Sequence, residues 1–151
     1  MLDVTFRTQP IKNAYNYWLS KTSRDKLPAR HNIDPAEMIA FLPNLILMDV
    51  KRLPLDFRYR LIGTHVASHL LTDLTNRWMS EVEHQKPPSI IWNTCKTVVE
   101  TAQPIYPHTP YVGPKKDIVD VEDILLPLAK DGINVDMLLI AISYVKKSSS
   151  N

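Results

Sequence analysis

The chain has 151 residues, enough for one domain that buries roughly 70% of the surface its unfolded chain would expose. Its 18 basic and 16 acidic residues give a net charge of +2 with no basic stripe, so the composition does not indicate a nucleic-acid-binding protein. The single cysteine, Cys95, excludes an intrachain disulfide and a cysteine-rich zinc site. There is no apolar run of the length that a membrane span or signal peptide needs, so we expect a cytoplasmic protein that does not bind membranes.

The first expected element is an amphipathic helix over about residues 10–21. Its apolar residues recur at the spacing of one helical face. With a polar connector, this helix makes up residues 1–30, which precede the main domain. Because an apolar helical face can pair with a second copy, we predict a homodimer. The predicted contact residues are Ile11, Tyr15, Trp18 and Leu19.

A short second helix is expected after Asp34, because aspartate at the cap, Pro35 at the first position and Glu37 at the third are typical of a helix start. Two strands follow. Residues 45–50 are nearly all apolar, and residues 57–62 alternate apolar with basic side chains. This alternation predicts an antiparallel strand pair.

The middle of the chain, residues 63–78, is expected to form short interrupted helical pieces, because its apolar residues recur about every four positions between polar breaks. A clearer helix begins after Pro87-Pro88 and ends before Pro104. Cys95 lies on the apolar face of this helix, so core packing is its expected role.

The last third of the chain predicts three strands, at residues 105–112, 118–128 and 135–145. Pro107 and Pro110 cannot donate hydrogen bonds to a neighbouring strand, so the first of the three is expected at a sheet edge. The strand at 135–145 is apolar on both faces, which favours a central place covered on both sides.

A polar, disordered tail is expected at residues 147–151. Together the elements predict an α+β fold, with a five-stranded antiparallel sheet, helices packed on one face, and the N-terminal helix flanking it. Residues 31–146 would form the main domain.

Several short segments carry a resemblance to a known family. They are Trp18-Leu19, Leu27-Pro28-Ala29-Arg30, Ile33-Asp34-Pro35, Leu42-Pro43-Asn44-Leu45, Phe57-Arg58-Tyr59-Arg60-Leu61-Ile62-Gly63-Thr64, Asp73-Leu74-Thr75 and Leu125-Leu126-Pro127-Leu128 with Asp131-Gly132. In this order and spacing, the chain resembles a family of PAS-like domains common in alphaproteobacteria. The resemblance implies the strand order 2-1-5-4-3, which agrees with the edge and central strands argued above. It also implies a sensory or interaction role, although Leu71 and Asn76 stand where such members carry glycine.

Seven residues are candidates to line a ligand pocket between the sheet and the helices, since such pockets are mostly apolar with few polar anchors. Core packing would explain the four aromatic candidates equally well and is the expected role of Cys95, while the two histidines could simply be partly buried or exposed on a short helix. The candidates are Tyr59, His65, His69, Trp78, Trp92, Cys95 and Tyr106.

Metal binding is not predicted. His65 and His69 are four residues apart and could face one ion, but no third ligand follows at a diagnostic spacing. Glu122 and Asp123 are adjacent in an expected strand and therefore lie on opposite faces, which is unsuitable for shared acid–base chemistry. The sequence identifies no cofactor.

The leading functional hypothesis is a sensory or interaction module without catalysis that binds a small-molecule ligand or a signalling protein. One alternative is a small-molecule enzyme, such as an isomerase or dehydratase, with Tyr59, His65 or Asp73 as acid or base. Another is a ligand-free scaffold with a filled core.

Overall fold

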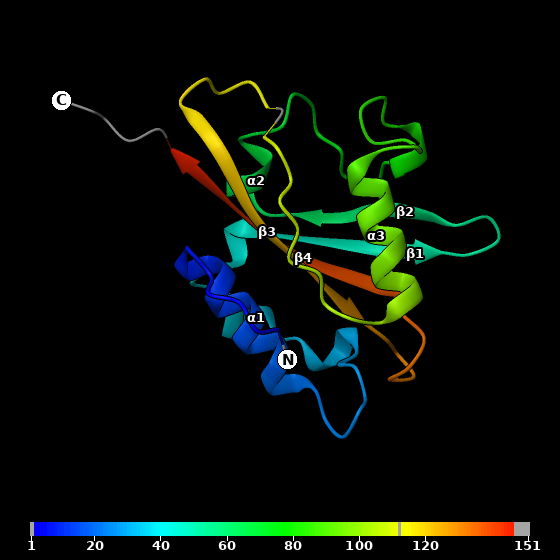
Figure 1. The fold of residues 1–151 in the computed structure, drawn as a ribbon. Helices are drawn as coiled ribbons and strands as arrows, with labels where there is room; N and C mark the ends of the chain where they lie inside the picture. The colour runs from blue at the N-terminus through cyan, green and yellow to red at the C-terminus, as the bar shows by residue number, and fades with distance from the viewer. Residues whose placement is uncertain (1, 112, 147–151) are drawn as a thin grey trace.

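Four antiparallel strands form one open sheet in the order β2-β1-β4-β3 (Figure 1). The computed structural model describes residues 2–111 and 113–146, so the predicted tail lies outside it. The strands are β1 (Leu45–Lys51), β2 (Asp56–Ile62), β3 (Ile118–Leu128) and β4 (Met137–Lys146). The α-helices are α1 (Gln9–Lys21), α2 (Thr64–Ala67) and α3 (Ile90–Thr101). The α+β class and the antiparallel sheet are thereby confirmed.

Strand β4 lies in the interior of the sheet, between β1 and β3, which confirms its expected central place. Leu139 and Ala141 join the core on one face of the sheet, while Leu138 and Ile140 join the core on the other. A strand that is apolar at both parities is thus buried on both sides.

The prediction of a fifth strand is wrong, because the described part of the chain forms a sheet of four strands. Between residues 105 and 111 the chain pairs with β3 only at Ile105, whose N–H and C=O both bond Leu125, at 3.0 and 2.9 Å. Pro107 and Pro110 have no N–H to continue a ladder, so the pairing stops there. Residue 112, the end of the predicted strand, lies outside the described residues.

Helix α1 packs on one face of the sheet, against β3 and β4. Ile11, Tyr15 and Trp18 are buried there, and the indole N–H of Trp18 donates to the carbonyl of Pro127 at 2.8 Å. Only Leu19 of the predicted contact residues is partly exposed. The apolar face therefore covers the chain's own sheet and is not a free surface for self-association. The homodimer itself stays a prediction.

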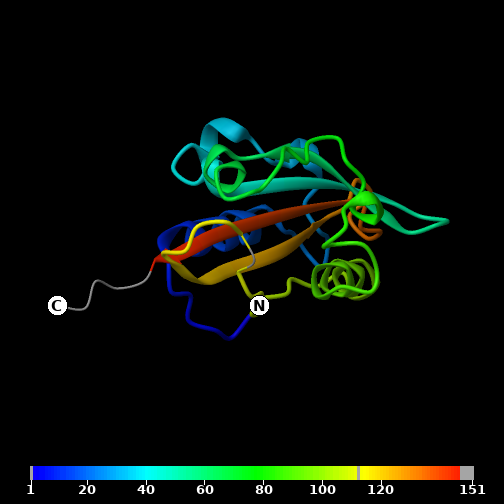
Figure 2. The same cartoon turned by 90° about the horizontal axis from the view of Figure 1, so that it is seen from above.

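Helix α3 packs on the opposite face, where Trp92, Cys95 and Val98 are buried in the second core. The core role of Cys95 is thereby confirmed, and Figure 2 shows α3 nearly end-on beside the sheet. The helix expected after Asp34 is only a short 3₁₀ turn, Pro35–Met38, although Asp34 caps it through the amide of Ala36 as expected.

Candidate ligand pocket

A pocket of about 360 Å³ lies on the α3 side of the sheet. Its volume is near the lower end of the range usual for small-molecule sites. The sheet, α2 and the loops that follow α2 and precede α3 all contribute to its wall. The apolar wall includes Ile46 and Met48 from β1, Val66 from α2, Val121 from β3, and Ile140 and Ile142 from β4.

The exposed part of the pocket lining contains both apolar and polar residues, with Thr72 and His84 as the polar ones. Leu71 and Ile90 are among the apolar ones, and their exposed fractions are 71% and 61%. Leu71 belongs to the loop after α2, and Ile90 opens α3. Exposed leucine and isoleucine at the rim of an apolar cavity favour entry of an apolar molecule.

His69 is a polar group in this wall and is 4% exposed. Its Nδ1 lies 2.8 Å from the carbonyl oxygen of His65, so Nδ1 carries a proton and donates it. The imidazole also stacks on the ring of Tyr144, with the centroids 3.7 Å apart and the planes at 6°. Its neutral form therefore keeps Nε2 as an acceptor in a fixed ring.

Tyr59 is a second polar group, and its hydroxyl donates to Oε1 of Gln85. Burial, together with the nearby Cys95 and Tyr144, raises the pKa of Tyr59 well above its ordinary value. The phenol therefore stays neutral at physiological pH. It can orient a ligand, but it is not a base there.

Asp123 is the acidic residue of the pocket, and it is 2% exposed. Its Oδ2 accepts a 2.8 Å hydrogen bond from the hydroxyl of Thr109, while Oδ1 has no hydrogen-bond partner among the residues that the structure describes. Burial raises the pKa of Asp123 to about 6, against smaller opposing effects of Thr109 and His108. A carboxylate in this state can accept a hydrogen bond from a ligand.

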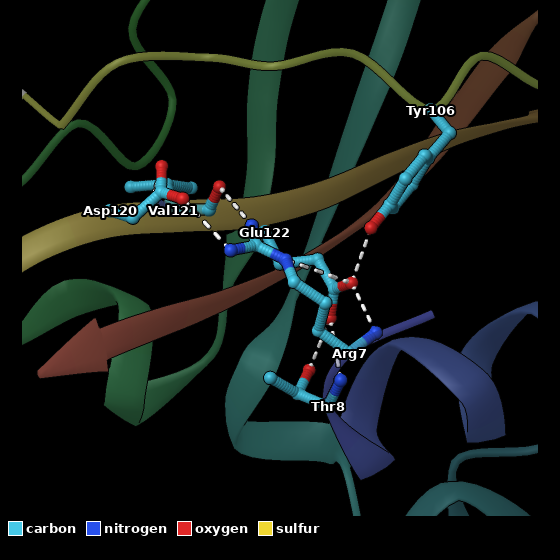
Figure 3. A network of polar contacts seen from close by, with 6 residues as sticks. All are labelled: Arg7, Thr8, Tyr106, Asp120, Val121 and Glu122. Atoms are coloured by element: carbon cyan, nitrogen blue, oxygen red, sulfur yellow. Dashed lines mark hydrogen bonds and ion pairs between the residues drawn. The ribbon is translucent and has the colours of Figure 1, made fainter. Parts of the chain in front are cut away.

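Glu122 lies on the other face of β3, as alternation along a strand requires. Figure 3 shows its carboxylate beside the start of α1, where it accepts hydrogen bonds from the amides of Arg7 and Thr8 at 2.6 and 2.8 Å. The hydroxyls of Thr8 and Tyr106 also donate to it. Burial alone would raise the pKa of Glu122, but these donors hold it below its ordinary value.

Two of the seven predicted pocket residues, Tyr59 and His69, line the pocket. His65 is exposed and contacts the pocket indirectly, through its ring contacts with His69 and Tyr144. Of the residues named for the enzyme alternative, only Tyr59 lines the pocket. Asp73 is exposed and caps its own turn by accepting from Thr75.

The other four predicted residues do not line this pocket. Trp92 and Cys95 pack in the core beneath α3, because they face the sheet. Trp78 lies under the cations of Lys51 and Arg58. Tyr106 lies on the far side of β3, with Glu122.

Asp123 is the acidic residue of the pocket lining, and it is not among the seven predicted pocket residues. Its signal is present in the sequence: it is an acidic residue with Val121 and Leu125 two positions to either side, on the same face of the expected strand. From the sequence alone, it is half of an adjacent carboxylate pair that is unsuitable for shared acid–base chemistry. No three side chains of His, Cys, Asp or Glu gather as metal ligands among the described residues.

The fold and site define an α+β domain in which helices cover both faces of an antiparallel sheet and one face holds a pocket. A family model described as PAS domain matches residues 6–142, so the chain belongs to the PAS domain family, whose members are generally sensory or interaction modules. The match includes α1. Comparisons with curated proteins and with solved structures found no match. No helix of the described residues has the length and apolar character that a membrane span requires.

Proposed function

We propose that this chain is a ligand-sensing PAS domain that binds a small, largely apolar molecule in the pocket and signals to a partner protein, without catalysis of its own. The observation that carries this proposal is the pocket itself, which has apolar walls from three strands and two exposed apolar residues, Leu71 and Ile90, in its lining. Most of the exposed surface of the pocket is apolar, and two of its polar side chains, His69 and Tyr59, are already hydrogen-bonded to His65 and Gln85. Fixed polar groups in an apolar cavity suit recognition of a ligand.

A variant that fills the pocket tests this function. Ile142 lines the pocket and is only partly buried, so Ile142→Trp should occupy the cavity at limited cost to folding. Val145 lies on the same strand, points to the opposite face and does not line the pocket, so Val145→Trp is the matched control. The probe is the neutral apolar dye N-phenyl-1-naphthylamine, followed by fluorescence.

We expect wild type and Val145→Trp to bind one dye molecule per chain, and Ile142→Trp to bind at least about tenfold more weakly, a loss of about 1.4 kcal/mol. Native mass spectrometry of freshly purified wild type should show any retained ligand as added mass. Thermal melting of all three proteins confirms that they fold. The proposal is wrong if wild type neither binds dye nor retains a ligand, or if Ile142→Trp binds dye as wild type does.

A further inference from the structure

We propose that the pocket selects a small amphipathic amine, whose protonated nitrogen donates a hydrogen bond to the free carboxylate oxygen of Asp123. This inference rests on the proposed function, because it names the ligand class of the same pocket. It depends on three features of the structure: the burial of this carboxylate, its incomplete hydrogen bonding, and the charge of its surroundings.

The carboxylate of Asp123 lies in apolar surroundings. All residues from 121 to 128 of β3 are buried, and Val121 and Leu125, two positions to either side of Asp123, share its face of the sheet. A buried charge is unfavourable unless it is paired and hydrogen-bonded. The described residues provide neither a counter-ion nor a full set of donors.

The hydrogen bonding of Asp123 is half complete. Thr109 donates to Oδ2 and thereby fixes the carboxylate plane, while Oδ1 remains buried without a partner. Thr109 belongs to the segment that runs beside β3 in place of a fifth strand. Buried carboxylate oxygens are normally hydrogen-bonded, and Asp123 lines the pocket, so a donor carried by the ligand would complete the set.

The surroundings favour a cation as that donor. None of the described residues that line the pocket is lysine or arginine. Tyr144 and Cys95 lie near Asp123, but burial raises the pKa of each, so both stay neutral.

Three histidines could carry positive charge there: His69 and His84 line the pocket, and His108 lies near Asp123 but is exposed to solvent. Among the described residues, none of the three forms an ion pair or a hydrogen bond with the carboxylate of Asp123, whose only hydrogen-bond donor is Thr109. A protonated amine would therefore meet an uncompensated negative charge, whereas a carboxylate ligand would be repelled.

Aromatic side chains offer a second contribution to the same selection. Tyr111 packs edge-on against Tyr144, with the ring centroids 5.7 Å apart, beside the stacked pair of His69 and Tyr144. All three rings line the pocket. The faces of the two tyrosine rings attract cations, and aromatic rings also accept the apolar body of an amphipathic molecule.

Three probes with one carbon skeleton test the inference: 4-phenylbutylamine, 4-phenylbutan-1-ol and 4-phenylbutanoate. Their binding is measured by calorimetry and by displacement of the naphthylamine dye, with wild type, Asp123→Asn and Asp120→Asn. Asparagine keeps the shape of Asp123 and an oxygen for Thr109. Asp120 lies on the same strand but pairs with Arg7 outside the pocket, so Asp120→Asn is the matched control.

We expect the amine to bind wild type and Asp120→Asn at least about tenfold more tightly than the alcohol, with the carboxylate weakest, since hydrogen bonds between charged groups are the stronger ones. Asp123→Asn should abolish the preference for the amine, because asparagine carries no charge. It should leave binding of the alcohol within about threefold of wild type, because the alcohol is also uncharged.

Equal binding of amine and alcohol by wild type would overturn the inference, as would tightest binding of the carboxylate or an amine preference that survives in Asp123→Asn. In each of these cases the pocket still binds ligand, so the proposed function stands. If wild type binds none of the three probes and no dye, the proposed function fails together with the inference.

Discussion

Two adjacent acidic residues on β3 have opposite environments. Glu122 is 1% exposed and accepts from two backbone amides and two hydroxyls. Asp123 is 2% exposed and has one described donor, Thr109. Burial raises the pKa of both carboxyl groups, but the four donors to Glu122 outweigh it and lower the pKa of Glu122, whereas the pKa of Asp123 stays raised. Hydrogen bonding, and not burial alone, decides the charge state at each position.

For Asp123 this difference predicts a dependence of stability on pH. Its folded pKa of about 6 is above its ordinary value of 3.8, so its ionisation opposes folding. The stability that the neutral acid provides is fully present below pH 3.8 and is lost as the pH rises through 6. At 1.36 kcal/mol per pKa unit, the loss is about 3 kcal/mol.

Asp123→Asn removes this titration. We therefore expect the unliganded variant to be more stable than wild type at pH 8, by on the order of 1–3 kcal/mol, and the difference to disappear near pH 4. Urea unfolding of both proteins at a series of pH values measures it. A constant difference across this range would contradict the raised pKa.

At the scale of elements, the start of α1 depends on a residue from another element. Its N-cap residue, Thr8, makes no hydrogen bond from its side chain to the first turn. Instead the Thr8 hydroxyl and the amides of Arg7 and Thr8 all donate to Glu122 on β3. A negative charge at this end also suits the dipole of the helix. The sheet thus fixes where α1 begins.

Loss of the Glu122 charge should therefore loosen this junction. In Glu122→Gln, the amide NH₂ group would face donors, so we expect a destabilisation of about 1–3 kcal/mol in urea unfolding at pH 7, with faster hydrogen exchange at Arg7 and Thr8. The gap from wild type should narrow as the pH falls through the depressed pKa of Glu122. Asp120→Asn, which breaks an exposed ion pair with Arg7, should cost under about 1 kcal/mol. A similar loss of unfolding free energy in Glu122→Gln and Asp120→Asn would refute this role of Glu122.

The elements also show what the sequence could predict. Apolar residues at both parities correctly placed β4 in the centre, and periodicity correctly identified α1 and α3. Prolines indicated that residues 105–111 lie at an edge, but the same missing N–H groups of Pro107 and Pro110 also end the pairing with β3 after Ile105, so only one bridge forms where an edge strand is predicted. For the apolar face of α1, periodicity cannot tell whether the chain's own sheet or a second copy covers it.

At the scale of the whole molecule, the sheet separates two cores. One core lies beneath α1 and the other beneath α3, and both use residues of β1, β3 and β4. Without α1, the apolar side chains on one face of the sheet would be exposed to water as a large patch. The N-terminal segment therefore belongs to the folded unit, even though the sequence suggested a boundary near residue 30.

Truncated chains test whether the N-terminal segment and residues 31–146 fold as one unit. A chain of residues 31–146 lacks α1, so we expect no cooperative thermal transition and strong dye binding to the exposed sheet face. A chain of residues 5–146 keeps α1 and Phe6, which packs on Tyr15 and Tyr106, and it should melt cooperatively. A sharp transition in the shorter chain would instead show that residues 31–146 fold alone.

The neighbouring carboxylates on β3 also provide an internal reference for spectroscopy. The carboxyl carbon of Asp123 should titrate near pH 6, whereas that of Glu122 should change only at a more acid pH. The two residues are neighbours in the sequence, but the side chain of Asp123 faces the pocket and that of Glu122 faces α1. The ¹³C shifts of their carboxyl carbons at pH 6 would therefore distinguish a change in the pocket from a change beneath α1. A molecule that enters the pocket would move one signal and leave the other in place, so each carboxylate serves as the control for the other.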